Sequence, residues 1–310
     1  MSDLEPQNQT KLYGLDKFIS ELVNLNFCHN LPNKILLSGL KGIGKSTLAY
    51  HFINYVLSQD EEYSYNLKDF EIDPNSRTFK TILNKSNTNF TLIDIDQDKK
   101  SIDINQIRKL ISNLNKSSFN EKPRFVLIDN IEYLNINSIN ALLKTLEEPN
   151  DGIYFILINN NKYILPTLKS RCLNYKIFFS HKEILEITKN VLNQNIFDYL
   201  HEDLINHYSS PGHLFNIINC INKFEINVKE TNLKNLLLIL LKNKSYKKEE
   251  KVKELIYYFI ELYFRNNISL RNLDLFKYYS YFLKKIEKTK KFNLDEETLF
   301  IEFENKVLNG

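Results

Sequence analysis

The sequence contains few cysteines, glycines and prolines, and each shortage excludes a class of protein. Its 310 residues include three cysteines, Cys28, Cys172 and Cys220, which lie far apart. They provide neither a disulfide framework nor a C-x-x-C metal half-site, so no zinc site is expected. Seven glycines and seven prolines are too few for many tight hairpins, which favours helices. Tryptophan is absent, and we attach no functional meaning to that.

Long hydrophobic runs and a strong charge imbalance are also missing. The longest apolar run, Leu236 to Leu241, is far shorter than the roughly 20 residues that a membrane span requires. The segment from Met1 to Leu12 lacks the apolar stretch of a signal peptide. With 41 Lys and Arg against 38 Asp and Glu, the net charge of +3 is too small for a surface that coats nucleic acid. We therefore expect a cytoplasmic protein without a membrane partner, and a local basic patch stays open.

The hydrophobic pattern predicts an α/β domain followed by a helical region. Short apolar runs alternate with amphipathic stretches up to Cys172, which is typical of a mostly parallel sheet with helices between its strands. Strands are expected at 35–37, 90–95, 125–128 and 154–158, and helices at 48–56, 102–114 and 139–146, the last ending before Pro149. Residues 60–89 are polar and are predicted to form an irregular insertion. The lysine-rich segment 242–253 is interpreted as a solvated linker and helix start, with DNA contact as the alternative.

One motif in the α/β part carries recognisable chemistry. Residues 39–47 match G-x-x-x-x-G-K-[ST], the phosphate-binding P-loop, between an expected strand and an expected helix. Glycines let backbone N–H groups surround phosphate oxygens, while the lysine reaches the β and γ phosphates. The predicted nucleotide-binding residues are Gly39, Gly42, Gly44, Lys45, Ser46, Thr47, Asp129 and Asn159. The alternative is a glycine-rich turn that holds no ligand.

Asp129 is the predicted acidic partner of the P-loop. It follows the apolar run 125–128, so it lies at the end of a central strand, where it could hold Mg²⁺ together with Ser46. We therefore expect ATP or ADP with Mg²⁺ as the cofactor. The next residue is Asn130, whose amide can orient a water molecule but cannot accept its proton. Slow or absent hydrolysis is therefore expected. Glu132 is a candidate substitute, although its place on the turn suggests that it points elsewhere.

Asn159, Asn160 and Asn161 follow the expected strand at 154–158. A polar side chain there could contact the γ phosphate or the attacking water, and a polar turn is an equal alternative. The pair Asn161-Lys162 is similar to the guanine-reading N-K-x-D turn, but Ile164 occupies the position of its aspartate. Specificity for GTP is therefore disfavoured.

Two further segments resemble the clamp-loader subunits of bacterial DNA polymerase III, and among them the delta-prime type. Residues 140–149, NALLKTLEEP, are similar to the N-A-L-L-K-x-L-E-E-P segment that follows the Walker B strand in that family. Ser170-Arg171-Cys172 resembles the family's S-R-C motif after its sensor 1 strand. Both occur in the family's order downstream of the P-loop, and the resemblance covers about residues 10–215.

The resemblance implies a fold, a site residue and partners. The fold is an α/β, RecA-like AAA+ P-loop domain at 1–179, a helical lid at 180–224 and a helical collar at 225–310 that joins subunits into an open ring. In that family the S-R-C arginine enters the ATP site of a neighbouring subunit, so Arg171 is expected to act as an arginine finger in trans. The alternative for Arg171 is a structural salt bridge near a strand end. The implied partners are the motor (gamma/tau) subunits and the delta subunit, and through the assembly the sliding clamp and primer-template DNA.

Departures from the family pattern favour the delta-prime type. The catalytic glutamate is replaced by Asn130, and the sensor 2 arginine is missing after Ser209-Ser210-Pro211-Gly212. The family's four-cysteine zinc module is absent from residues 60–89, which predicts a looser insertion. We thus expect a subunit without ATPase activity of its own within the DNA-directed DNA polymerase (nucleotidyltransferase) holoenzyme. The alternative is an ATP-hydrolysing motor subunit of the same loader.

Overall fold

The chain divides into two compact units. The computed structural model describes residues 4–96, 99, 101–116, 120–147, 151–224, 231–247, 249–268, 273–292 and 294–309. The first unit comprises Met1–Ile187 with Ser210–Gly212, and the second comprises Thr188–Ser209 with His213–Gly310. The division into three domains at 179/180 and 224/225 stays a prediction.

A five-stranded sheet forms the centre of the first unit. The strands are β1 (Lys34–Ser38), β2 (Phe90–Ile93), β3 (Arg124–Ile128), β4 (Ile153–Asn159) and β5 (Leu173–Lys176). Their order is β2-β3-β4-β1-β5, and every neighbouring pair is parallel. Four of the strands and the parallel arrangement confirm the α/β class. The fifth strand was not expected, because β5 is short and only partly buried and thus lacks a continuous apolar run.

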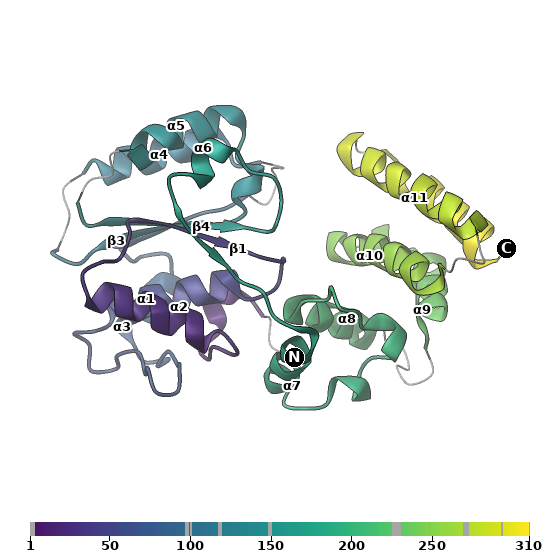
Figure 1. Ribbon diagram of the computed structural model, residues 1–310, viewed down its shortest axis with the longest axis horizontal. Coiled ribbons are helices and arrows are strands. Elements are labelled where there is room, and N and C mark those ends of the chain that lie inside the picture. The colour runs from purple at the N-terminus through teal and green to yellow at the C-terminus, as the bar shows by residue number, and fades with distance from the viewer. Residues whose placement is uncertain are drawn as a thin grey trace. The chain divides into compact units, whose positions relative to one another are not determined.

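Helices cover both faces of this sheet (Figure 1). One face packs against α1 (Asp16–Phe27), α2 (Lys45–Leu57) and α3 (Arg77–Leu83), and the other against α4 (Ile104–Leu114), α5 (Ile136–Glu147) and α6 (Pro166–Lys169). Neighbouring strand residues alternate between the two cores: Leu37 and Leu127 face the first core, whereas Leu36 and Val126 face the second. Burial on both faces explains why the central strands are continuous apolar runs.

The segment at 60–89 is more ordered than predicted. It contains helix α3, and Phe79 and Ile82 of that helix are buried in the core. Glu61 organises the turn before the helix, since its carboxylate accepts hydrogen bonds from Ser76 Oγ at 2.9 Å and from Thr78 Oγ1 at 2.6 Å. These hydrogen bonds hold the pKa of Glu61 below its ordinary value despite partial burial. The Glu61 carboxylate and the apolar burial of α3 therefore anchor this segment.

The second unit is helical in its described part. Helix α7 (His181–Leu192) and helix α8 (Pro211–Lys223) each begin in the first unit and end in the second. Further helices are α9 (Leu233–Lys242), α10 (Glu250–Asn267), α11 (Leu273–Phe292) and α12 (Glu296–Phe303). Phe264, Phe282 and Phe303 from three of them form a cluster of rings whose centroids lie 5.3–6.0 Å apart. No helix in the described ranges is long and apolar enough to cross a membrane.

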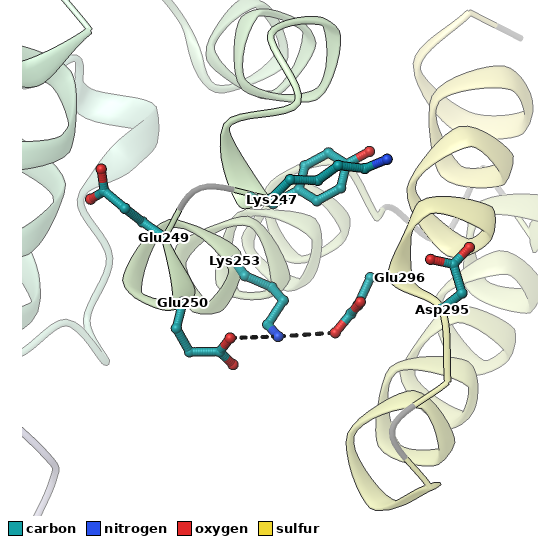
Figure 2. A pocket seen from close by; sticks show the side chains of 7 residues that line it. Lys247, Glu249, Glu250, Lys253, Asp295 and Glu296 are labelled. Carbon is teal, nitrogen blue, oxygen red and sulfur yellow. Dashed lines mark hydrogen bonds and ion pairs between the residues drawn. The ribbon is translucent and has the colours of Figure 1, made fainter. Parts of the chain in front are cut away.

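The lysine-rich segment contains both a turn and the start of α10. Lys247 pairs with Glu297 at 2.5 Å. Lys253 pairs with Glu250 at 2.6 Å and with Glu296 at 3.0 Å, in a cleft of about 290 Å³ (Figure 2). Exposed pairs of this kind add little stability. Lys247 and Lys253 are thus paired within the chain, and the choice between a solvated linker and DNA contact stays a prediction.

His51 of α2 is a fully buried histidine that ties three segments together. Its Nε2 lies 3.1 Å from the carbonyl oxygen of Gln9, and its Nδ1 lies 2.9 Å from the hydroxyl of Tyr65. Because a carbonyl only accepts, Nε2 carries the proton and Nδ1 accepts from Tyr65. Burial lowers the pKa of His51 to about 4. The folded protein therefore keeps this imidazole neutral at pH values where the unfolded chain protonates it.

We predict that His51 makes the protein less stable in mild acid. The contribution of the neutral imidazole to the free energy of unfolding is fully present above pH 6.5, the ordinary pKa of histidine. It is lost as the pH falls towards 4, the pKa of His51 in the folded protein. Between pH 7 and pH 5 the loss should be about 2 kcal/mol, from 1.36 kcal/mol per pKa unit. Urea unfolding of the wild type, His51→Gln and the exposed control His207→Gln at both pH values measures it. An equal pH effect in all three proteins would contradict the assignment.

Candidate nucleotide-binding site

The P-loop connects β1 to α2 at the carboxyl end of the sheet. Gly44 has φ +96°, a left-handed conformation that glycine adopts without strain, and α2 begins directly after it. The Gly39 N–H donates to the carbonyl of Asn159 at 3.2 Å, which attaches the loop to the neighbouring strand β4. Gly42, with φ +79°, provides the other left-handed turn of the loop. The predicted strand–loop–helix setting is therefore present.

Lys45 is a buried cation inside this loop. Its Nζ donates to the carbonyl oxygens of Gly39 at 3.0 Å and Leu40 at 2.7 Å, and the residue is 3% exposed. Burial lowers the pKa of Lys45 to about 8, although the negative charges of Asp129 and Glu132 oppose the shift. Its hydrogen-bond acceptors among the described residues are neutral carbonyls, so the ammonium gains a stronger partner when an anion enters.

Ser46 and Asp129 form the link between α2 and the central strand β3. The Ser46 hydroxyl donates to Asp129 Oδ2 at 2.6 Å. Burial raises the pKa of Asp129, while the hydrogen bond from Ser46 lowers it. The two predicted metal-binding side chains are thus brought together. Thr47 is the next residue of α2 and is partly buried.

A polar network extends from Asp129 along the carboxyl edge of the sheet. Asn130, at φ +56°, donates from Nδ2 to Asp94 Oδ1 at 2.8 Å. Asn160 donates from Nδ2 to Asn130 Oδ1 at 2.8 Å and to Glu132 Oε1 at 3.0 Å. The ends of β2, β3 and β4 therefore share one set of hydrogen bonds.

The position of Glu132 differs from the expectation. It was predicted to point elsewhere, but its carboxylate joins the network by accepting from the backbone N–H and the side chain of Asn160. The short 3-10 helix Ile131–Tyr133 after Asn130 turns it back towards the sheet edge. Asn160 was one of three asparagines considered after the strand, with Asn159 preferred as the site residue, and Asp94 was not considered. The rule that identified Asp129, a polar residue after a parallel strand, would have identified Asp94 after β2.

Asn159 closes a turn in this structure. Its Nδ2 donates to the carbonyl of Lys162 at 3.0 Å, and its Oδ1 accepts from the Lys162 N–H at 3.1 Å. The residue is 6% exposed. Asn160, rather than Asn159, contacts Asn130 and Glu132 near Asp129. The nucleotide-binding role of Asn159 stays a prediction.

The first turn of α8 lies against the P-loop. Ser210 Oγ donates to the carbonyl of Lys41 at 2.7 Å, and the N–H of Gly212 donates to the carbonyl of Gly42 at 2.9 Å. A Cβ at Gly212 would lie 2.9 Å from the same oxygen, so glycine permits this approach. Where the sensor 2 arginine is missing, backbone and hydroxyl groups of residues 210–212 therefore contact the loop.

Arg171 lies at the surface after α6. One of its terminal nitrogens, Nη2, contacts Glu147 Oε1 at 2.6 Å, and Nη1 donates to the carbonyl of Thr167 at 2.8 Å. The side chains of Arg171 and Glu147 are 33% and 53% exposed. The arginine is therefore in a salt bridge but is not buried by it. Of the segment 140–149, Glu148 and Pro149 lie outside the described residues.

The side chains at the P-loop fit a Mg²⁺-bound nucleotide. Lys45 would hold phosphate oxygens, and Ser46 with Asp129 would hold the ion, because hydroxyl and carboxylate oxygens are the ligands that Mg²⁺ prefers. The bound ion would supply charge neutralisation at the phosphates. No cluster of three or more His, Cys, Asp or Glu side chains among the described residues could bind a metal by itself.

This fold and site define a P-loop protein of the AAA+ class, with a RecA-like α/β domain as its first unit. Residues 14–182 match the family described as DNA polymerase III, delta subunit. The match covers more than half of the 310-residue chain, so the chain belongs to this family and the resemblance to clamp-loader subunits is confirmed.

Similar proteins carry the names of two subunit types. A DNA polymerase III subunit gamma from Buchnera aphidicola subsp. Schizaphis graminum is 28% identical over 251 residues, covering 73% of this chain and 62% of that protein. The subunit delta' of the same organism is 25% identical over 287 residues, covering 87% and 84%. Against four curated gamma and delta' relatives, the chain spans 62%, 52%, 49% and 40% of their lengths. A solved gamma subunit-related protein from Thermotoga maritima matches with a TM-score of 0.46 and 19% identity, covering 91% of this chain and 96% of that one.

We predict that nucleotide binding weakens as the pH rises through the pKa of Lys45. The ammonium is mostly charged at pH 7 and mostly neutral at pH 9, so the affinity for Mg²⁺–ATP should fall about tenfold. Fluorescent-nucleotide titration of the isolated chain measures the change. Lys45→Arg should bind with little pH dependence because a guanidinium stays charged. Equal wild-type affinity at both pH values, or undiminished binding by Lys45→Ala, would contradict the assignment.

Proposed function

We propose that this chain is the non-motor, delta-prime type subunit of a replicative clamp loader. It would offer Arg171 to the ATP site of a neighbouring motor subunit and help to load the sliding clamp onto primed DNA. It would do so in the cytoplasm, in contact with gamma/tau and delta subunits. Clamp and primer-template DNA would be reached through the assembly.

The observation that carries the non-motor role is Asn130. It follows Asp129 directly in the chain. Its side-chain amide donates a hydrogen bond from Nδ2 to Asp94 and accepts one at Oδ1 from Asn160. An amide in this position cannot remove a proton from water, so the general base of the usual AAA+ site is missing. The P-loop would then bind nucleotide for structural reasons, while the neighbouring subunit carries out hydrolysis.

The surface position of Arg171 supports the finger role. A guanidinium is always charged and can bridge phosphate oxygens. The side chain is partly exposed, and its ion pair with Glu147 lies at the surface, where such pairs are weak. The pair with Glu147 therefore leaves Arg171 accessible to a phosphate.

Arg171→Ala tests the proposed role in the reconstituted loader. Turnover at the ATP site that receives Arg171 should fall about 10³-fold. The DNA-stimulated ATPase rate of the whole loader should fall by the fraction that this one site contributes to it. Lys169→Ala removes a nearby exposed charge from α6 and should leave the rate unchanged. An unchanged rate with Arg171→Ala would refute the finger.

A motor subunit is the second candidate, and the position of Glu132 favours it. The carboxylate contacts Asn160 beside Asn130 and affects the electrostatics of Lys45. In that case Glu132 would accept the proton of the attacking water.

The purified chain assayed alone separates the two candidates. The delta-prime type predicts no steady ATP turnover with or without primed DNA. Turnover that is lost in both Lys45→Ala and Glu132→Gln would instead establish a motor with Glu132 as its base.

A further inference from the structure

Glu147 is the side chain that holds Arg171. It is the last residue of α5, whereas Arg171 lies just after α6, and the two meet through a 2.6 Å contact between Oε1 and Nη2. We propose that Glu147 is a positioning residue, which orients the Arg171 guanidinium so that its remaining N–H groups bind a phosphate of the neighbouring subunit's nucleotide. This inference rests on the proposed function of Arg171.

Both partners are attached to fixed backbone. Leu146, next to Glu147, is fully buried, and its carbonyl accepts from Lys34 Nζ at 2.9 Å. Leu168, three residues before Arg171, is 1% exposed. The carbonyl of Leu168 accepts a hydrogen bond from Cys172 Sγ at 3.4 Å. Because the backbone on both sides has buried neighbours, the direction of the guanidinium is determined by its contacts with Glu147 and with the carbonyl of Thr167.

The guanidinium still has donors to offer. Arg has five N–H groups. Among the described residues, Arg171 uses one for Glu147 and one for the carbonyl of Thr167. Three N–H groups therefore stay available on a planar fork that is already oriented, and such a fork matches the oxygens of a phosphate.

A purely structural role for Glu147 is disfavoured by its position. The C-terminal end of a helix carries partial negative charge, so a carboxylate on the last residue of α5 opposes the helix dipole. Its favourable interaction is with Arg171. Because both side chains are partly exposed, the pair orients the arginine without preventing a phosphate from binding it.

The test is a double-mutant cycle in the reconstituted loader. Glu147→Ala should lower the kcat of DNA-stimulated ATP hydrolysis by less than Arg171→Ala, about tenfold at the affected site, because the charge remains but its orientation is lost. The KM for ATP should be unchanged. Glu147→Gln keeps an acceptor oxygen and should be intermediate. Arg171→Ala combined with Glu147→Ala should be no slower than Arg171→Ala alone, since Glu147 acts only through the arginine.

The controls separate a failure of this inference from a failure of the proposed function. Glu186→Ala removes an exposed carboxylate from α7 and should leave the rate unchanged. If Arg171→Ala itself has no effect, the proposed function is wrong. If Arg171→Ala slows the loader but Glu147→Ala and Glu147→Gln do not, only the positioning role is wrong. A double variant slower than Arg171→Ala, or a lower melting temperature of the isolated Glu147→Ala chain, would show a structural role instead.

Discussion

The hydrogen bond between the Ser46 hydroxyl and Asp129 is the contact on which the arrangement of the site depends. It joins the P-loop helix α2 to the central strand β3 at 2.6 Å. From Asp129 the polar contacts continue through Asn130 to Asp94 and Asn160, so three strand ends are held in register with the loop. A parallel sheet makes this arrangement available, because the carboxyl ends of its strands lie at one edge.

The chain path after β4 connects the two parts of the proposed function. Asn160 belongs to the network at the chain's own P-loop. The same stretch then leads through α6 to Arg171, which Glu147 holds at the surface. Residues 160–171 are therefore one continuous stretch of chain that runs from the P-loop network to the surface arginine.

Much of the first unit could be predicted from the sequence because its signals are local. The apolar runs of β1, β3 and β4 and the glycine spacing at 39–44 identify strands and loop without tertiary information. The segment at 60–89 could not, since Glu61 and the buried face of α3 act through contacts far along the chain. The direction of Glu132 and the choice between Asn159 and Asn160 could not be predicted for the same reason: which side chain faces the site depends on the left-handed turns at Asn130 and Asn161.

The proposed role of Arg171 is to complete a neighbouring subunit's ATP site. The most direct measurement is a structure of the assembled loader with ADP and a metal fluoride that mimics the transferred phosphate bound to the motor subunits. We expect the Arg171 guanidinium to lie within hydrogen-bond distance of that mimic while it still contacts Glu147. A structure in which Arg171 faces no nucleotide, or in which the chain's own P-loop holds the same mimic with Glu132 beside it, would contradict the proposed role.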